Sequence, residues 1–197
     1  LAVKAPLTVP LCAIPGYQRQ IREEMPNLRP DLGNDLSALR REAIRVLLQR
    51  AGEDPNLAEP AFEVFFEARQ KVSFFDDALP ALDFLAAKYP MVALSNGNAD
   101  IQKVGLSHYF KAAFNPISLG VGKPDPKMFH AGAQALGVLP EEVLHIGDDP
   151  HLDVLASQRA GLQAVWVNRE EKLWTHDVHP APYTVISLRE LCDSWPL

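Results

Sequence analysis

Apolar positions in the first part of the chain recur at helical spacing. Between residues 36 and 51 an apolar side chain returns every three or four positions, with arginines and a glutamine on the opposite side. This stripe predicts an amphipathic helix. A phenylalanine-rich stretch over 62–72 predicts a second helix, whose aromatic face is expected to pack inside a helical bundle. A further helix is predicted over Tyr17–Met25, ended by Pro26.

After Asp76 the pattern changes to short apolar runs that alternate with helical segments. Such alternation predicts a mostly parallel, Rossmann-like sheet with helices on both faces, in an α/β domain. Ligands bind such sheets at the carboxyl ends of the strands. The strands are predicted at 91–94, 114–119, 143–146, 163–167 and 183–187. The helices are predicted at 78–88, at 101–106, from Asp125–Pro126 onward and at 151–160.

The two patterns divide the chain into three parts. Residues 1–14 are predicted to be an irregular N-terminal segment, residues 15–74 a small all-helical domain, and residues 75–197 the α/β core. The composition agrees with this, because 47% of the 197 residues are hydrophobic and 22% are charged. These fractions are ordinary for a globular protein.

Charge and cysteine content narrow the possible partners. The net charge is -6, with both signs interspersed, which disfavours nucleic-acid binding because that requires a basic face. A small anionic substrate is still compatible with this net charge, since positive side chains can line a pocket.

No apolar run reaches the ~20 residues of a membrane span. Two distant cysteines without CxxC spacing favour free thiols in a reducing cytoplasm over a disulfide.

Three groups of polar residues follow predicted strands, and the first is Ser95, Asn96 and Gly97, directly after strand 91–94. A hydroxyl, an amide and a flexible glycine backbone at a strand end can donate hydrogen bonds to phosphate oxygens. The same residue types are also common in ordinary turns.

The second group surrounds Lys123, in the segment Gly120–Pro126. A lysine ammonium can neutralise a phosphate dianion, and a solvated loop lysine is the alternative. A P-loop is excluded because Pro124 stands where that motif requires Ser or Thr.

The third group is Asp148, Asp149 and Asp153, which follow strand 143–146 within six residues of one another. Three carboxylates are costly to gather unless a cation offsets their charge. Oxygen ligands without cysteine favour Mg²⁺ over zinc, so the three aspartates are the predicted metal site. Capping of the next helix explains one aspartate well and three less well. The neighbouring His145 is expected to be structural and not a metal ligand.

Taken in this order, the three groups resemble motifs of the haloacid dehalogenase superfamily. Ser95-Asn96-Gly97 resembles its second motif, Lys123 in GKPDP its third, and Asp148-Asp149…Asp153 its fourth. The resemblance runs from about residue 75 to 191. The helical segment ahead of it is similar to the small helical cap that many members insert after their first strand. The branch that looks closest has helical caps and dephosphorylates sugars and nucleotide-like metabolites.

The first motif of that superfamily, a strand ending in Asp-x-Asp, is missing from this chain. In the family its first aspartate attacks phosphorus, the second acts as general acid and base, and the strand is the central one of the sheet. Either the residues that carry this motif belong ahead of Leu1, or the chain is a catalytically inactive relative. We favour the first interpretation, because Lys123 and the three aspartates serve no obvious purpose in an inactive protein.

The resemblance implies a Mg²⁺-dependent phosphomonoester hydrolase that acts on a small phosphorylated metabolite through an aspartyl-phosphate. In that scheme Asp148 ligates Mg²⁺, with Asp149 as a second candidate, and Asp153 orients the metal's water or Lys123. Ser95 and the N–H groups near Asn96 hold the phosphoryl oxygens, while Lys123 offsets the charge of phosphate and nucleophile. Two alternatives remain open: a haloacid dehalogenase, which would use no metal, and a noncatalytic binding module with the same fold.

Overall fold

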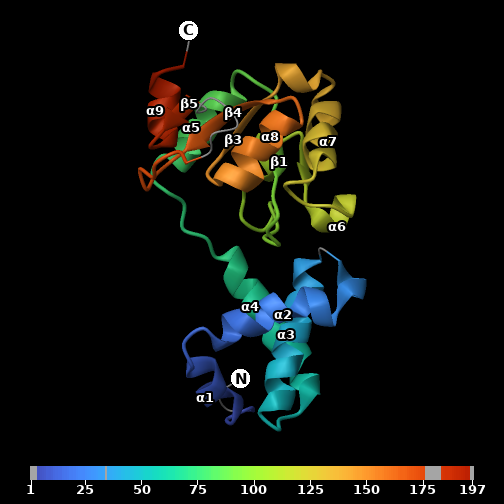
Figure 1. The fold of residues 1–197 in the computed structure, drawn as a ribbon. Coiled ribbons are helices and arrows are strands. Elements are labelled where there is room, and N and C mark those ends of the chain that lie inside the picture. The colour runs from blue at the N-terminus through green and yellow to red at the C-terminus, as the bar shows by residue number, and fades with distance from the viewer. Residues whose placement is uncertain (1–3, 34, 176–182, 196–197) are drawn as a thin grey trace. The chain divides into compact units, whose positions relative to one another are not determined.

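The structure is a computed structural model that describes residues 4–33, 35–175 and 183–195 (Figure 1). The chain divides into two compact units. The helical unit comprises Leu1–Val72 and Gly97–Val104, and the α/β unit comprises Ser73–Asn96 and Gly105–Leu197. Each unit has hydrophobic clusters of its own.

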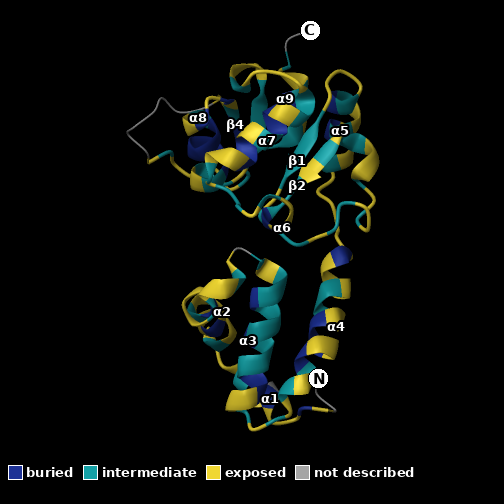
Figure 2. Ribbon diagram, turned by 90° about the vertical axis from the view of Figure 1, so that its right-hand side faces the viewer, coloured by how far each residue is buried: buried dark blue, intermediate teal, exposed yellow. Residues whose placement is uncertain are grey.

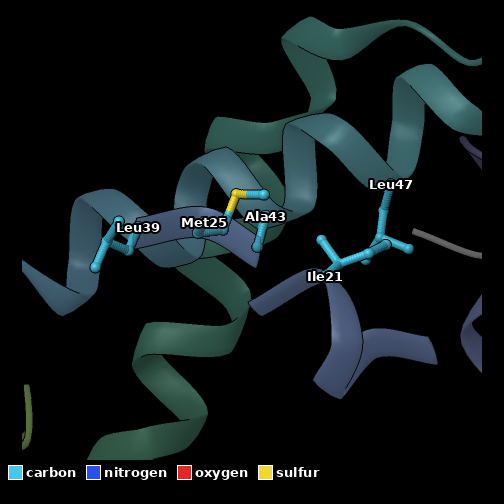
Figure 3. Packing of buried hydrophobic residues seen from close by; sticks show 5 residues of the cluster. All are labelled: Ile21, Met25, Leu39, Ala43 and Leu47. Atoms are coloured by element: carbon cyan, nitrogen blue, oxygen red, sulfur yellow. The ribbon is translucent and has the colours of Figure 1, made fainter. Parts of the chain in front are cut away.

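In the helical unit, α2 and α4 both pack against α3. The seam between α2 and α3 is filled by the side chains of Ile21, Met25, Leu39, Ala43 and Leu47 (Figure 3). The amphipathic stripe predicted over 36–51 is thereby confirmed as α3. The α-helices are α1 (Thr8–Ala13), α2 (Tyr17–Leu28), α3 (Leu36–Arg50) and α4 (Ala58–Gln70). Short 3-10 turns are η1 (Pro30–Leu32) and η2 (Pro55–Leu57).

Two expectations for this unit are corrected. Residues 8–13 form α1, whereas the segment 1–14 was expected to be irregular. Helix α2 runs through Pro26 to Leu28, where the Arg29 N–H donates to the Met25 carbonyl oxygen at 2.8 Å. A proline removes one N–H donor and crowds the carbonyl of the preceding turn, and at Pro26 the helix ends two residues later, so few of its bonds are affected.

The segment Gly97–Val104 joins the helical unit through α4. The backbone N–H of Asp100 donates to Oε1 of Gln70 at 2.8 Å. A helix was predicted at 101–106, but residues 101–105 form turns. The Asp100 carboxylate accepts from the Gln102 N–H at 2.8 Å, and such a local bond competes with helix formation.

In the α/β unit every strand pair is parallel. Strand β1 pairs with β2, and a separate sheet has the order β3-β4-β5. The strands are β1 (Val92–Leu94), β2 (Ala112–Phe114), β3 (Leu144–Gly147), β4 (Gln163–Val167) and β5 (Tyr183–Val185). The helices are α5 (Ala78–Ala86), α6 (Pro116–Leu119), α7 (Pro126–Leu136), α8 (Ala156–Arg159) and α9 (Leu188–Asp193). The remaining turns are η3 (Ser107–Tyr109), η4 (Pro140–Glu142) and the π-helical η5 (Pro150–Leu155).

Strands β1 and β2 form one sheet and β3, β4 and β5 form another, and no strand pairing among the described residues joins the two. The resemblance assigns the Asp-x-Asp strand, which this sequence lacks, to the centre of the family's sheet.

Helices cover both faces of the three-stranded sheet. Helix α9 packs its buried Leu191 against Val165, Val167 and Val185. On the other face Phe129 of α7 meets the ring of His145 edge-on, with centroids 5.1 Å apart. One side of α7 is buried and the opposite side is exposed, as expected for a helix that packs on a sheet (Figure 2). The α/β class with a parallel sheet is therefore confirmed.

One predicted strand of this unit is wrong. The strand expected over 114–119 ends at Phe114, and residues 116–119 form α6. Asn115 and Ser118 cap this helix reciprocally, with bonds of 2.9 and 3.0 Å. A capping box followed by Pro at the first helical position stops the strand and starts a helix.

Within the described ranges, none of the helices combines the length and apolar character that crossing a bilayer requires. The two cysteines, Cys12 and Cys192, are both free.

Candidate functional site

A buried ion pair lies among the predicted site residues of the α/β unit. Nζ of Lys123 donates to Oδ1 of Asp153 at 2.5 Å, and the two side chains are only 12% and 5% exposed. Removing two charges from water is costly, and it is tolerated where good geometry and further hydrogen bonds compensate. Lys123 belongs to the segment between α6 and α7, and Asp153 to η5. The third and fourth sequence motifs are therefore joined directly.

Both oxygens of Asp153 are used. Oδ1 also lies 3.1 Å from Nε2 of His145, and Oδ2 accepts from the backbone N–H of Asp149 at 3.1 Å. Burial alone would raise the pKa of Asp153, but the hydrogen bond to His145 and the charge of Lys123 outweigh it and hold that pKa well below its usual range. The carboxylate is therefore ionised at neutral pH and fixes the Lys123 ammonium.

Gly147, the last residue of β3, makes room for this carboxylate. A Cβ at Gly147 would lie 2.4 Å from Cγ of Asp153, a distance at which something must shift. Glycine lets the Asp153 side chain lie directly against the strand end. A second close approach occurs at Gly122, where a Cβ would lie 2.8 Å from Oδ1 of Asn96.

Asn96 holds the backbone of Lys123. Its Nδ2 donates to the Lys123 carbonyl oxygen and its Oδ1 accepts from the Lys123 N–H, both at 2.7 Å. Just before it, the N–H of Ser95 donates to the Phe114 carbonyl oxygen at 3.0 Å and extends the pairing of β1 with β2. The Asn96 side chain is therefore a positioning group for Lys123, and phosphate binding by the N–H groups near it stays a prediction. Gly97, predicted with them, belongs to the helical unit.

The three aspartates do not converge. Oδ1 of Asp149 accepts from the N–H groups of His151 and Leu152, both at 2.8 Å, and so caps η5. Asp153 is bound to Lys123, as described. Asp148 is exposed. Among the described residues its carboxylate forms no hydrogen bond or close ion pair, and it interacts with the charge of Lys172. The described part of the chain contains no cluster of three His, Cys, Asp or Glu side chains that could hold a metal.

This arrangement fits one kind of metal site. Mg²⁺ is usually bound through one or two carboxylates, with water and substrate phosphate completing its coordination. Asp148 follows β3 directly and fits such a role, because its exposed carboxylate accepts no hydrogen bond from the residues that the structure describes. Asp149 and Asp153 have other partners and fit it less well.

Sequence reasoning assigned His145 a structural role but did not identify its partner, and it missed Trp166. His145 is a polar residue inside an apolar strand, and that position was a signal that it bonds a buried group, here Asp153. Trp166 of β4 donates from Nε1 to the Asp148 carbonyl oxygen at 3.0 Å and holds the start of the acidic segment. Nothing in the sequence indicated this bond.

Comparison with known proteins identifies relatives of this chain. A sequence model of the haloacid dehalogenase-like hydrolases matches residues 14–161. A phosphoserine phosphatase of Thermus thermophilus is 35% identical over 136 residues, covering 66% of this chain and 55% of that protein. A 5-amino-6-(5-phospho-D-ribitylamino)uracil phosphatase of Escherichia coli is 30% identical over 175 residues, covering 86% of this chain and 74% of that protein.

A solved structure is also similar. A 2-haloacid dehalogenase from Pseudomonas syringae pv. Tomato DC3000 is 33% identical, with a TM-score of 0.84 over 98% of this chain and 84% of that one. The chain spans 55% of the length of the Thermus relative, about half. Similar proteins thus include both phosphatases and a dehalogenase, and the structural likeness confirms the fold.

Proposed function

This chain belongs to the haloacid dehalogenase-like hydrolase family, and on that premise we propose that it serves a Mg²⁺-dependent phosphomonoester hydrolase acting on a small phosphorylated metabolite. The observation that carries the proposal is the buried ion pair of Lys123 with Asp153. It holds an ammonium group in place in the same unit as the exposed carboxylate of Asp148. A fixed positive group and a free metal ligand suit a phosphate dianion.

In the proposed reaction Lys123 binds the phosphoryl oxygens and offsets their charge. Its ammonium has three donors, of which one is bound to Asp153. Asn96 and His145 act indirectly, by holding the Lys123 backbone and the Asp153 carboxylate. The Ser95 hydroxyl and nearby N–H groups would donate to the same phosphoryl oxygens. Charge fixed in this way contributes several kcal/mol to catalysis, because little reorganisation is needed during reaction.

Asp148 would hold the metal. When bound, Mg²⁺ supplies positive charge to the phosphoryl oxygens as a Lewis acid. Asp149 would keep the end of β3 and the start of η5 in position, since its carboxylate caps that helix.

The reaction also needs a nucleophile. None of the 197 residues forms an Asp-x-Asp after an apolar strand, so these residues do not supply that carboxylate. A test of turnover therefore uses a strand-extended form, in which an apolar strand ending in Asp-x-Asp precedes Leu1.

Two other functions have support of their own. The similarity to the Pseudomonas dehalogenase favours halide release, but a metal-free dehalogenase leaves the exposed Asp148 carboxylate without a role. The missing Asp-x-Asp favours a noncatalytic binding module, but such a module needs no buried Lys123–Asp153 pair.

The proposal is tested by calorimetric titration of the 197-residue chain with inorganic phosphate, with and without Mg²⁺. We expect phosphate to bind, Lys123→Ala to weaken it at least tenfold, and Asp148→Asn to remove only the effect of Mg²⁺. Lys127→Ala is the matched control, because that lysine lies nearby at the start of α7 and donates to the Leu119 carbonyl oxygen. Equal binding by the Lys123→Ala and Lys127→Ala variants would contradict the proposal.

A further inference from the structure

A pocket lined by arginines lies within the helical unit. Its volume is about 360 Å³, which is in the range of small-ligand sites, roughly 300–1,000 Å³. No carboxylate is found among its described lining residues. The residues that matter for its chemistry are Arg22, Arg40, Arg69, Leu39, Phe65 and Asn98.

The arginines of this pocket differ from the others of the unit. The sequence of the helical unit contains eight arginines. Five form ion pairs with carboxylates, namely Arg19, Arg29, Arg41, Arg45 and Arg50. Arg22, Arg40 and Arg69 form no ion pair and no hydrogen bond with any residue that the structure describes. The three arginines that have no carboxylate partner in the described part of the chain are thus the three that share one pocket.

Arg40 is the most constrained of the three. Its guanidinium carbon lies 4.6 Å from the centroid of the Phe65 ring. Burial lowers the pKa of Arg40, and the charges of Arg22 and Arg69 lower it further. Arginine remains protonated nonetheless, because its ordinary pKa is above 12. The pocket therefore holds a partly desolvated positive charge that is repelled by two further positive charges. A bound anion would reduce this repulsion and offset the loss of solvation.

We propose that this pocket binds a carboxylate or phosphate group of an organic anion. Planar guanidinium groups bind both kinds of anion with two parallel hydrogen bonds, while Leu39 and Phe65 offer apolar surface to the rest of the ligand.

The proposal is tested by measuring the binding of a small dicarboxylate. The 197-residue chain is titrated with succinate at low ionic strength, and the uncharged succinamide serves as the comparison probe. We expect succinate to bind and succinamide not to bind. Arg22→Gln, Arg40→Gln and Arg69→Gln should each weaken succinate binding at least tenfold. Arg22 and Arg69 are exposed, so their substitution carries little risk of misfolding.

Two controls separate this pocket from other sites. Arg41→Gln is matched to Arg40→Gln, because Arg41 is its neighbour in α3 but pairs with Glu59 and Glu63. Lys123→Ala tests whether succinate binds at the phosphate site instead. Loss of succinate binding in either control, or its survival in all three pocket variants, would overturn the proposal.

Discussion

The side-chain amide of Asn96 holds both backbone polar groups of Lys123, with each hydrogen bond at 2.7 Å. The two residues are 27 positions apart in sequence, and they come from the second and third motifs. An amide is the side-chain group that can donate and accept at once in this geometry. The position of the Lys123 ammonium is therefore fixed from two sides, by Asn96 at its backbone and by Asp153 at its Nζ.

Asn96→Asp should disturb this geometry more than its small change in size suggests. The new oxygen would face the Lys123 carbonyl oxygen without a proton between them, so a buried acceptor is left unsatisfied. We expect a loss of about 1–3 kcal/mol in the free energy of unfolding, measured by urea denaturation, together with weaker phosphate binding. Asn115→Asp is the control, since Asn115 only accepts as the cap of α6 and Asp caps equally well. Equal losses in both variants would speak against the amide's special role.

The Lys123–Asp153 pair should show strong energetic coupling. Each single variant, Lys123→Gln or Asp153→Asn, leaves the other charge buried without its partner, which costs about 3–5 kcal/mol. The double variant should lose clearly less than the sum of the two single losses. The measurement is a double-mutant cycle on unfolding free energies, and additive losses would show that the two residues do not interact.

Gly147→Ala should be poorly tolerated, because its Cβ would lie 2.4 Å from Cγ of Asp153. We expect a destabilisation of about 1–3 kcal/mol from overpacking, with displacement of Asp153 and weaker binding at Lys123. Gly132→Ala is the matched control within α7, where a Cβ would lie 3.5 Å from the nearest Leu94 atom, an ordinary contact. There alanine should be neutral or stabilise by up to about 1 kcal/mol, since it favours the helix. Thermal unfolding of both variants gives the comparison.

Asp77 should make stability depend on pH. Its two oxygens accept from Arg169 at 2.9 Å and from the Leu188 N–H at 2.8 Å. The hydrogen bond from Arg169 lowers the pKa of Asp77 and outweighs the opposite effect of burial. A lowered folded pKa contributes stability above the unfolded value of about 3.9, and this contribution is lost as pH falls through the folded value.

The corresponding measurement compares Asp77→Asn with the original protein from pH 7 downward. The difference in unfolding free energy should be about 1–3 kcal/mol at pH 7 and should shrink below about pH 4. Asp76→Asn, at the exposed neighbouring position, should change little at any pH. A difference for Asp77→Asn that grows on acidification would contradict the assigned role.

Much of the α/β unit could be predicted from sequence, because buried parallel strands appear as short apolar runs. Strand β4 coincides with its predicted range of 163–167, and β3 is displaced by one residue from 143–146. The predictions at 114–119 and 101–106 were wrong where local capping decided the outcome, through Asn115 with Ser118 and through Asp100. Side-chain hydrogen bonds of this kind are weak signals beside hydrophobic periodicity.

The candidate site, too, could be predicted only in part. The sequence pattern indicated that Lys123 and the aspartates act together, since each follows an apolar run. It could not assign the three aspartates, because one caps a helix, one pairs with Lys123 and one stays exposed, and these roles depend on tertiary contacts. The pocket arginines were not distinguished from other helix-surface arginines, because the distinction lies in which of them lack a carboxylate partner.

Product release by the strand-extended form distinguishes a phosphatase from a dehalogenase. Phosphate release from phosphorylated metabolites and halide release from 2-haloacids are followed side by side, with and without Mg²⁺. We expect phosphate release that requires Mg²⁺ and that Lys123→Ala and Asp148→Asn abolish. Halide release without Mg²⁺, unchanged by Asp148→Asn, would show dehalogenation instead and overturn the proposed function.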